Sequence, residues 1–95
     1  MWYADSEVIA VNELIKETTR VYAEDDEGRL VAEITFPMTE PGVYCIDHTF
    51  VDGSLRGQGV ADRLVRAALE QIQANGGRPT ATCSYAAAWL DKHRA

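Results

Sequence analysis

Hydrophobic and polar residues alternate along the first half of the chain in a way that predicts strands. Residues 14–24 are rich in β-branched and aromatic side chains, which favours a strand that ends at the acidic turn 25–28. Residues 30–36 carry apolar side chains at every even position, which is typical of a strand with one buried face. The short turn between these segments predicts that they pair as a hairpin. The first dozen residues show no clear period, so we expect an arm or an edge element there.

A third strand is predicted over residues 43–51, after a second turn at 37–42. Both faces of this segment are largely apolar, which is typical of a central strand that is covered on two sides. The sequence Asp-Gly-Ser at 52–54 then ends the strand.

The apolar period changes to that of a helix from residue 60 onward, with a polar stripe that includes the pair Asp62 and Arg66. Two consecutive glycines at 76–77 are expected to end this helix. A short strand follows at 80–82, and we expect a last helix at 85–93 that Ser84 caps. That helix is expected to bury Tyr85, Ala88 and Trp89.

The order strand, strand, strand, helix, strand, helix predicts an α+β fold. Its sheet is expected to be mostly antiparallel, with one parallel pair formed by the third and fourth strands, a crossover helix between them and a C-terminal helix. In such a unit, ligands bind beyond the carboxyl ends of the parallel strands, at the N-terminus of the crossover helix. The stretch LRGQGVADRL, residues 55–64, lies at that point.

Composition and charge narrow the classes of partner. The chain has 95 residues, of which 46% are hydrophobic and 25% charged, so we expect one domain over residues 1–95. Nine basic and 15 acidic residues give a net charge of -6, which argues against a nucleic-acid partner and suits a cationic substrate, although many acidic surfaces serve solubility alone.

The sequence also predicts a soluble, unprocessed protein that does not act at a membrane. No apolar run approaches the length of a membrane span, and the opening residues lack the basic start of a signal peptide. Cys45 and Cys83 have no CxxC spacing and no accompanying histidine cluster, so neither a metal site nor a disulfide framework is expected. Free cysteines favour the cytoplasm.

The glycine-rich stretch suggests an anion site. Gly57 and Gly59 precede a predicted helix, whose first N–H groups have no partner within the helix and whose dipole adds positive potential. Because glycine has no Cβ, a phosphate can approach the backbone closely, and Arg56 can add a fixed charge. From the glycines alone, a tight strand-to-helix turn is the simpler interpretation.

The segment RGQGVA, residues 56–61, resembles the Q/R-x-x-G-x-G/A signature of the GCN5-related N-acetyltransferases (GNAT). The wider stretch IDHTFVDGSLRGQGVADRLVRAAL, followed by PTATCSYAAAWLDKH, resembles the very small single-domain acetyltransferase-like proteins of that superfamily, over about residues 46–93. This resemblance implies a minimal GNAT-like fold. It also implies acetyl-coenzyme A as the acetyl donor and an amine as acceptor: a small amine, a lysine or an N-terminus. The chain lacks the length for the helices that follow the first strand in larger members.

The resemblance further implies which residues bind the coenzyme. The main chain near Phe50 and Val51 is expected to hydrogen-bond the pantetheine arm. Ser84 and Tyr85 are expected to contact the coenzyme or to cap the last helix, with the cap favoured for Ser84. The pyrophosphate is expected to bind Arg56, Gly57, Gln58, Gly59, Val60 and Ala61.

Cys83 is the first candidate catalytic residue. It directly precedes the last predicted helix, where the dipole and free N–H groups lower the pKa of a thiol. The resemblance places a cysteine here, near the coenzyme's sulfur. Cys83 then either protonates the departing thiolate during direct transfer, which the resemblance favours, or takes the acetyl group itself as a nucleophile. The alternative without chemistry is a small buried thiol at a strand end.

His48 is the second candidate catalytic residue, as the base that deprotonates an ammonium acceptor. A hydrogen-bonded histidine in the core is an equally good interpretation. Asp47, on the opposite face of the strand, is a weaker candidate for binding a cationic acceptor. We assign Cys45 to packing and His93 to solvent.

Three functions remain open from the sequence. The leading prediction is an acetyl-coenzyme A-dependent N-acetyltransferase. The second is a non-catalytic module that binds coenzyme A or an acyl-coenzyme A. The third is a structural domain in which the glycine loop only makes a turn.

Overall fold

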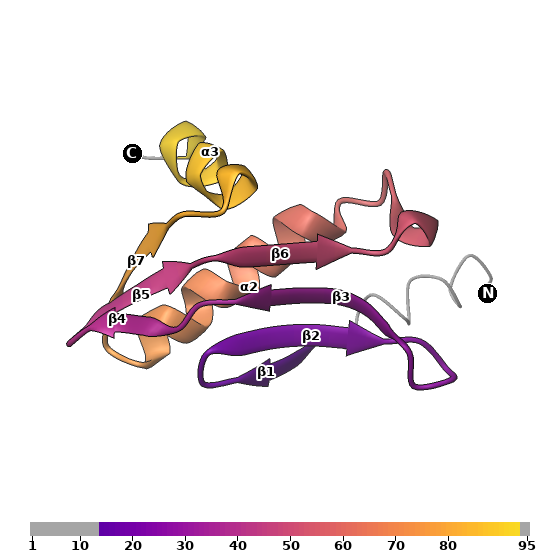
Figure 1. The fold of residues 1–95 in the computed structure, drawn as a ribbon, viewed down its shortest axis with the longest axis horizontal. Helices are drawn as coiled ribbons and strands as arrows, with labels where there is room; N and C mark the ends of the chain where they lie inside the picture. Colours follow the sequence, from indigo (N-terminus) through magenta and orange to yellow (C-terminus); the bar gives the residue numbers. More distant parts are fainter. Residues whose placement is uncertain (1–13, 94–95) are drawn as a thin grey trace.

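The computed structural model describes residues 14–93, which fold as a small α+β unit (Figure 1). The strands and helices in chain order are β1 Ile15–Glu17, β2 Arg20–Glu24, β3 Leu30–Thr35, β4 Met38–Glu40, β5 Val43–Ile46, β6 His48–Val51, the 3-10 turn η1 Gly53–Leu55, α2 Val60–Ala74, β7 Arg78–Ala81 and α3 Ser84–Lys92. The arm or edge element expected for the first dozen residues lies outside this range.

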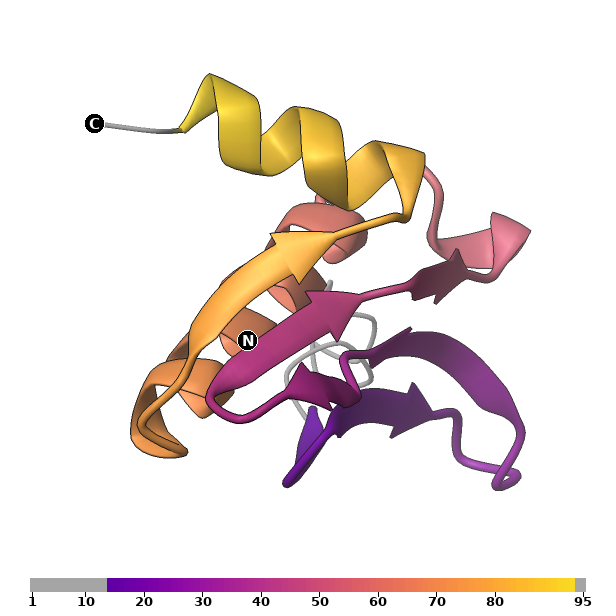
Figure 2. The ribbon, with the colours of Figure 1, turned by 60° about the vertical axis from the view of Figure 1, so that its left-hand side comes forward.

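The described strands are divided between two sheets. The first has the order β1-β2-β3-β6 with antiparallel neighbours, and the second has the order β4-β5-β7 (Figure 2). β4 and β5 are antiparallel, whereas β5 and β7 form a parallel pair. The predicted α+β class, with mostly antiparallel pairs, one parallel pair, a connecting helix and a C-terminal helix, is confirmed. A single sheet was expected, and the strands form two.

The two sheets separate at Asp47, within the segment expected to be one strand. Thr35 pairs with His48 in the first sheet, and the N–H of Cys45 donates to the carbonyl of Pro37 at 2.9 Å beside the second. Pro37 has no N–H to continue the ladder, so both neighbouring strands change sheets at the same place. The prediction of a strand covered on two sides is correct for β5, which is fully buried, and wrong for β6, whose alternate residues are exposed.

The expected turn at 37–42 also contains a strand. Met38 pairs with Tyr44 in β5, so the turn is reduced to Pro41 and Gly42. Gly42 has a φ of +77° after a proline, which is the arrangement of a type II turn. The turn at Pro41 and Gly42 was predicted correctly. The strand formed by the three residues between the two prolines was not predicted.

The segment 14–24 forms a hairpin instead of the single strand that was expected. β1 and β2 pair in antiparallel register around a turn at Thr18 and Thr19. The carbonyl of Thr19 accepts from the N–H of Phe36, and the carbonyl of Thr18 accepts from the side chain of Asn75. These tertiary contacts fix the turn, and the local pattern of residues contains no sign of them.

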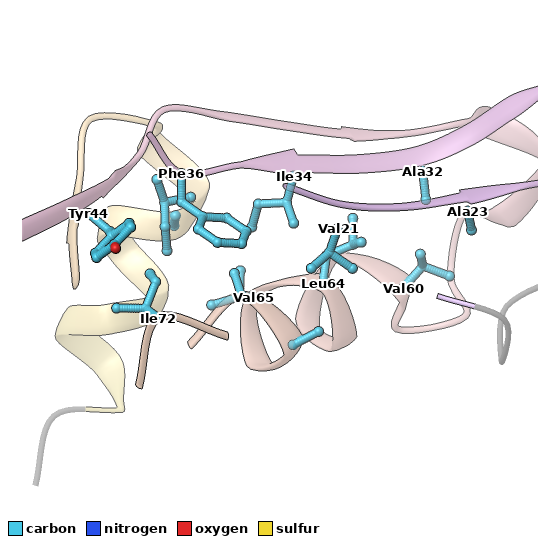
Figure 3. Packing of buried hydrophobic residues seen from close by; sticks show 14 of the residues in the cluster. Val21, Ala23, Ala32, Ile34, Phe36, Tyr44, Val60, Leu64, Val65 and Ile72 are labelled. Carbon is cyan, nitrogen blue, oxygen red and sulfur yellow. The ribbon is translucent and has the colours of Figure 1, made fainter. Parts of the chain in front are cut away.

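The core lies between α2 and the two sheets (Figure 3). Every other residue of β2 is buried, and α2 contributes its buried stripe at helical spacing, as predicted. The seven largest fully buried side chains are Val21, Ile34, Phe36, Ile46, Leu64, Val65 and Ile72. Figure 3 shows the ring of Phe36 between Tyr44 and Ile34, above Val65.

Both glycines that were expected to end α2 do so. The N–H of Gly76 donates to the carbonyl of Gln73, and the N–H of Gly77 donates to that of Ile72, which is the Schellman arrangement. Gly76 has a φ of +81°. Gly77 packs against the ring of Tyr44 so closely that a Cβ would not fit.

The last helix differs from expectation at its start. Its N-cap residue is Cys83, not Ser84, which is the first helical residue. Ala86 is its fully buried side chain, whereas Tyr85 is 42% exposed and Ala88 is exposed. The helix packs against β7 and α2, and this places Ala86 inward and Trp89 only partly so. None of the described helices is long and apolar enough to span a bilayer.

Candidate functional site

The glycine loop between η1 and α2 has the geometry of a main-chain anion site. Gly57 and Gly59 have φ values of +82° and +72°, in the left-handed region that favours glycine. A Cβ built on either glycine would meet nothing within 4 Å, so tight packing does not require glycine here. The left-handed backbone requires it, and the absence of a side chain leaves the loop open to a ligand. Gly59 is the N-cap of α2 and offers no side chain to the helix's first N–H groups. Those donors remain available to a ligand.

A pocket of about 310 Å³ adjoins this loop. It is bounded by the end of β6, the glycine loop, the first turn of α2 and the first turn of α3. Seven of the predicted coenzyme-binding residues line it: Val51, Arg56, Gly57, Gly59, Val60, Ala61 and Tyr85. Gln58, Phe50 and Ser84 do not line it, and all three are exposed.

Asp52 is a residue of this pocket that the sequence reasoning missed. Its carboxylate accepts from the N–H of Ser54 at 3.0 Å and from the hydroxyl of Ser54 at 2.5 Å. These two bonds, the hydroxyl first, hold the pKa of Asp52 below its usual range against the opposing effect of burial. Asp52 therefore fixes the turn that leads into the glycine loop. The Asp-Gly-Ser sequence carries the signal, since aspartate commonly bonds the backbone two residues on.

Asp62 joins the first turn of α2 to α3. Its Oδ1 accepts from the indole Nε1 of Trp89 at 2.6 Å, and its Oδ2 accepts from Nε of Arg66 at 2.8 Å. The pKa of Asp62 is lowered, most by the Trp89 bond and then by Arg66. The predicted pair of Asp62 and Arg66 is confirmed. The bond to Trp89 was missed, because nothing local connects positions so far apart in the sequence.

Replacement of Asp62 with asparagine is expected to lower the free energy of unfolding at neutral pH by about 1 kcal/mol, a value discounted because the carboxylate is 39% exposed. The pKa of Asp62 is lowered in the folded state, so this stability is present above the ordinary carboxyl value of 3.8. It disappears as pH falls through the lowered pKa. Urea unfolding of both proteins from pH 7 to pH 2 measures the difference.

The control Asp91→Asn removes an exposed carboxylate from α3 and should change the free energy of unfolding by less than about 0.5 kcal/mol. If the wild-type protein still had the higher free energy of unfolding at pH 2, the difference from Asp62→Asn would come from packing and not from charge.

Cys83 lies where the two sheets separate. Its N–H donates to the carbonyl of Ile46, the last residue of β5, and its Sγ lies 3.5 Å from the hydroxyl of Thr49 in β6. Burial alone raises the pKa of this thiol. Hydrogen bonds from the backbone of Ala86 and Tyr85 and from Thr49 outweigh burial, and the pKa lies below its usual value. The start of α3 thus acts on Cys83 as the sequence analysis predicted.

The pocket and Cys83 share one side of β6. Thr49 pairs with Ile34 and Val51 pairs with Ala32, and both of these partners are fully buried, so Thr49 and Val51 face the core side of the first sheet. Val51 lines the pocket, and Thr49, one step back along the strand, contacts Cys83. An extended group that enters past Val51 therefore runs toward Cys83.

His48 lies on the opposite face of β6. Its side chain is 53% exposed, so the interpretation as a core histidine is wrong. Its Nε2 lies 3.4 Å from Oε1 of Glu33 in β3. The side chain of Phe50 shares this outer face and is 37% exposed, so it does not lie on the pocket side.

The remaining candidates have partners within the chain. Asp47 accepts from the hydroxyl of Thr35 at 2.5 Å. Cys45 is buried, as assigned. His93 is exposed and stacks on Trp89 with ring centroids 3.9 Å apart. Over residues 14–93, no group of three or more histidine, cysteine or acidic side chains is placed to hold a metal ion.

Comparisons with known proteins agree on one family. A family model described as GCN5-related N-acetyl-transferase matches residues 20–95. The solution structure of a GCN5-like protein from Staphylococcus aureus is 36% identical, with a TM-score of 0.68, and the match covers 84% of this chain and 78% of that one. No curated protein matches the chain.

Two crystal structures extend the comparison to larger proteins. A GNAT-family N-acetyltransferase from Escherichia coli, solved with coenzyme A, is 26% identical with a TM-score of 0.56, and the match covers 77% of this chain and 45% of that one. A ribosomal-protein-alanine N-acetyltransferase from Brucella melitensis shares the fold at 20% identity and a TM-score of 0.60, over 80% of this chain and 62% of that one. This chain spans less than two thirds of either larger protein.

Proposed function

The chain belongs to the GCN5-related N-acetyltransferase family, and from that premise we propose that it transfers an acetyl group from acetyl-coenzyme A to an amine. The observation that carries the proposal is the pocket itself. It adjoins an open glycine loop at a helix N-terminus, and it lies on the same side of β6 as Thr49, which contacts the half-buried thiol of Cys83. We propose that residues 1–95 act as one acetyltransferase domain.

The coenzyme's parts are assigned by the chemistry along this path. The pyrophosphate binds the loop from Arg56 to Ala61, where N–H groups, the helix dipole and one guanidinium converge. The pantetheine arm hydrogen-bonds the main chain near Phe50 and Val51, because the edge of β6 opposite β3 is not paired with β7 among the described strands. Tyr85 covers the arm from α3, with Ser84 beside it.

The thioester then lies near Cys83. A neutral amine attacks the thioester carbonyl carbon, and the C–S bond breaks with its electron pair on sulfur. The nitrogen that becomes the amide loses its surplus proton to water, and the coenzyme leaves as a thiolate that needs a proton. The pKa of Cys83 is lower than that of an ordinary thiol, so proton transfer from Cys83 to an alkyl thiolate is favourable. We propose direct transfer with Cys83 as this proton donor and His48 as the base for the acceptor ammonium.

The acceptor class follows from the requirement for a nucleophilic amine. A small amine, a lysine side chain and a protein N-terminus each satisfy it. The net charge of -6 favours an acceptor that is cationic before it loses its proton.

The test of the binding site is a calorimetric titration with acetyl-coenzyme A. The variant Arg56→Ala is expected to bind about 10-fold more weakly than wild type, because one charge-assisted contact to the pyrophosphate is lost. The matched control is Arg78→Ala, which removes the same charge from the start of β7, at the opposite end of the parallel strands. Equal affinities in all three proteins, or no binding at millimolar ligand, would reject the coenzyme site.

One observation favours the second function, a non-catalytic coenzyme A-binding module. In residues 14–93, the chain passes from β1 to β6 without any helix, so no described helix covers the outer face of the first sheet. Coenzyme A release with a panel of amines separates the two functions. Sustained release supports the enzyme, and saturable binding without release supports the module.

A further inference from the structure

Glu33 carries a charge on the outer face of the first sheet, yet its side chain is only 18% exposed. Its two oxygens have different partners. Oε2 lies 2.7 Å from Nε of Arg20 in β2, and Oε1 lies 3.4 Å from Nε2 of His48 in β6. The carboxylate therefore bridges the two strands that flank β3.

The sheet register explains the partial burial of this carboxylate. Tyr22, Glu33 and Phe50 occupy one row across β2, β3 and β6. Side chains opposite each other in such a row are in contact distance, so an aromatic ring lies on each side of Glu33. Reduced access of water strengthens the hydrogen bond that the carboxylate accepts from Arg20 and its attraction to a protonated His48.

Arg20 fixes one end of the bridge. Its guanidinium lies over the ring of Tyr22, 3.8 Å from the centroid, and its bond to Glu33 is the main reason that the pKa of Arg20 is raised. With Oε2 occupied by Arg20, Oε1 remains for His48. A neutral imidazole that donates from Nε2 to this oxygen keeps its lone pair on Nδ1.

The contact between Glu33 and His48 matters for acetyl transfer because His48 lies next to Thr49, the residue that contacts Cys83. His48 and Thr49 are consecutive in β6 and face opposite sides of the sheet, and Thr49 contacts Cys83. Both lie directly after Asp47, where the two sheets separate. His48 on the outer face and Cys83 on the inner face therefore lie on the two sides of the start of β6.

We propose that Glu33 is a positioning residue that holds His48 as the Nε2–H tautomer, so that Nδ1 removes the proton from an ammonium acceptor. This inference rests on the proposed acetyl transfer. The acceptor's N–H bond breaks, the proton moves to Nδ1, and the amine keeps the electron pair that attacks the thioester. The resulting imidazolium is stabilised by Glu33, and Arg20 keeps the carboxylate in place.

The kinetic test compares Glu33→Gln with Glu17→Gln. The second is the matched control, because exposed Glu17 lies 3.5 Å from the same arginine and is not within ion-pair distance of His48. Glu33→Gln is expected to lower kcat by about 10-fold or more while KM for acetyl-coenzyme A stays unchanged, since the tautomer and its charge partner are lost. Glu17→Gln should behave as wild type. Equal kcat in Glu33→Gln and wild type would overturn the proposal.

A second measurement needs no variant at Glu33. The ¹⁵N chemical shifts of the imidazole nitrogens report the tautomer at high pH, and His93→Gln removes the other histidine to assign the signals. The Nε2–H form at His48 is expected, and the Nδ1–H form would overturn the proposal even if turnover is normal. If wild type binds acetyl-coenzyme A but releases no coenzyme with any amine, acetyl transfer itself fails. The role of Glu33 in transfer then fails with it, even where the Nε2–H form is found.

Discussion

Replacement of Cys83 with alanine is expected to lower kcat by about 100-fold or more, while the affinity for acetyl-coenzyme A changes by less than about twofold. Without the thiol, the departing thiolate must take its proton from water or leave unprotonated. The contacts assigned to the coenzyme involve the glycine loop and the main chain of β6, so binding loses little. The effect should therefore appear in kcat and not in the dissociation constant.

Coenzyme A release, followed with a thiol reagent, and calorimetric titration measure the two quantities separately. The control Cys45→Ala removes a thiol that is buried at the β5–β7 pair, 3.7 Å from the hydroxyl of Thr82 and outside the pocket. It should keep kcat at the wild-type level. If Cys83→Ala had the same kcat as wild type, Cys83 would not be the proton donor, and its role would be packing.

Intact mass distinguishes the two chemical roles of Cys83. Direct transfer predicts an unmodified chain after mixing with acetyl-coenzyme A alone. One added acetyl group, absent from Cys83→Ser, would instead identify Cys83 as a nucleophile.

Replacement of Phe36 with alanine is expected to reduce the free energy of unfolding by about 3–5 kcal/mol. The ring is fully buried where the two sheets meet and packs between Tyr44 and Ile34, above Val65 on α2 (Figure 3). Its removal leaves a cavity that the strands cannot close, since β3 and β4 are held in register on either side. Domains are usually stable by about 5–15 kcal/mol, so the loss is a large fraction of the total.

Urea unfolding, monitored by circular dichroism, measures this loss. The control Met38→Ala truncates a large apolar side chain only two residues away that is 55% exposed, and it should cost less than about 0.5 kcal/mol. Similar losses in the two variants would mean that Phe36 is not a central core residue.

Local patterns in the sequence predict the parts of the fold that local interactions determine. The helical period from residue 60, the two glycines that end α2 and the parallel strand pair on either side of α2 in the chain are confirmed. The break at Asp47 was missed, because apolar residues on both sides of it suggest one strand. The turn at Thr18 and Thr19 was missed because its hydrogen bonds come from Phe36 and Asn75, which are distant in sequence.

In the candidate site too, the sequence predicts the features that depend on neighbouring residues and misses those that depend on distant contacts. The glycine loop is contiguous in the sequence, and Val51 and Tyr85 converge on it through the topology that the element order predicts. Glu33 was assigned no role from the sequence. Its contacts with Arg20 and His48 depend on strand register, which sequence alternation alone does not determine.

The bend at Pro37 and Asp47, where two paired strands pass from one sheet to the other, has a consequence for the order in which the chain folds. β3, β4, β5 and β6 form one two-stranded ribbon closed by Pro41 and Gly42, so its pairings are close in sequence and cost little loop entropy. The pairing of β5 with β7 encloses the whole of α2 between the paired strands, so we expect it to form later than the ribbon. Cys83 and Tyr85 follow β7, so the pocket is completed only at this late step. Partial opening of the C-terminal segment would dismantle the site while the ribbon stays folded.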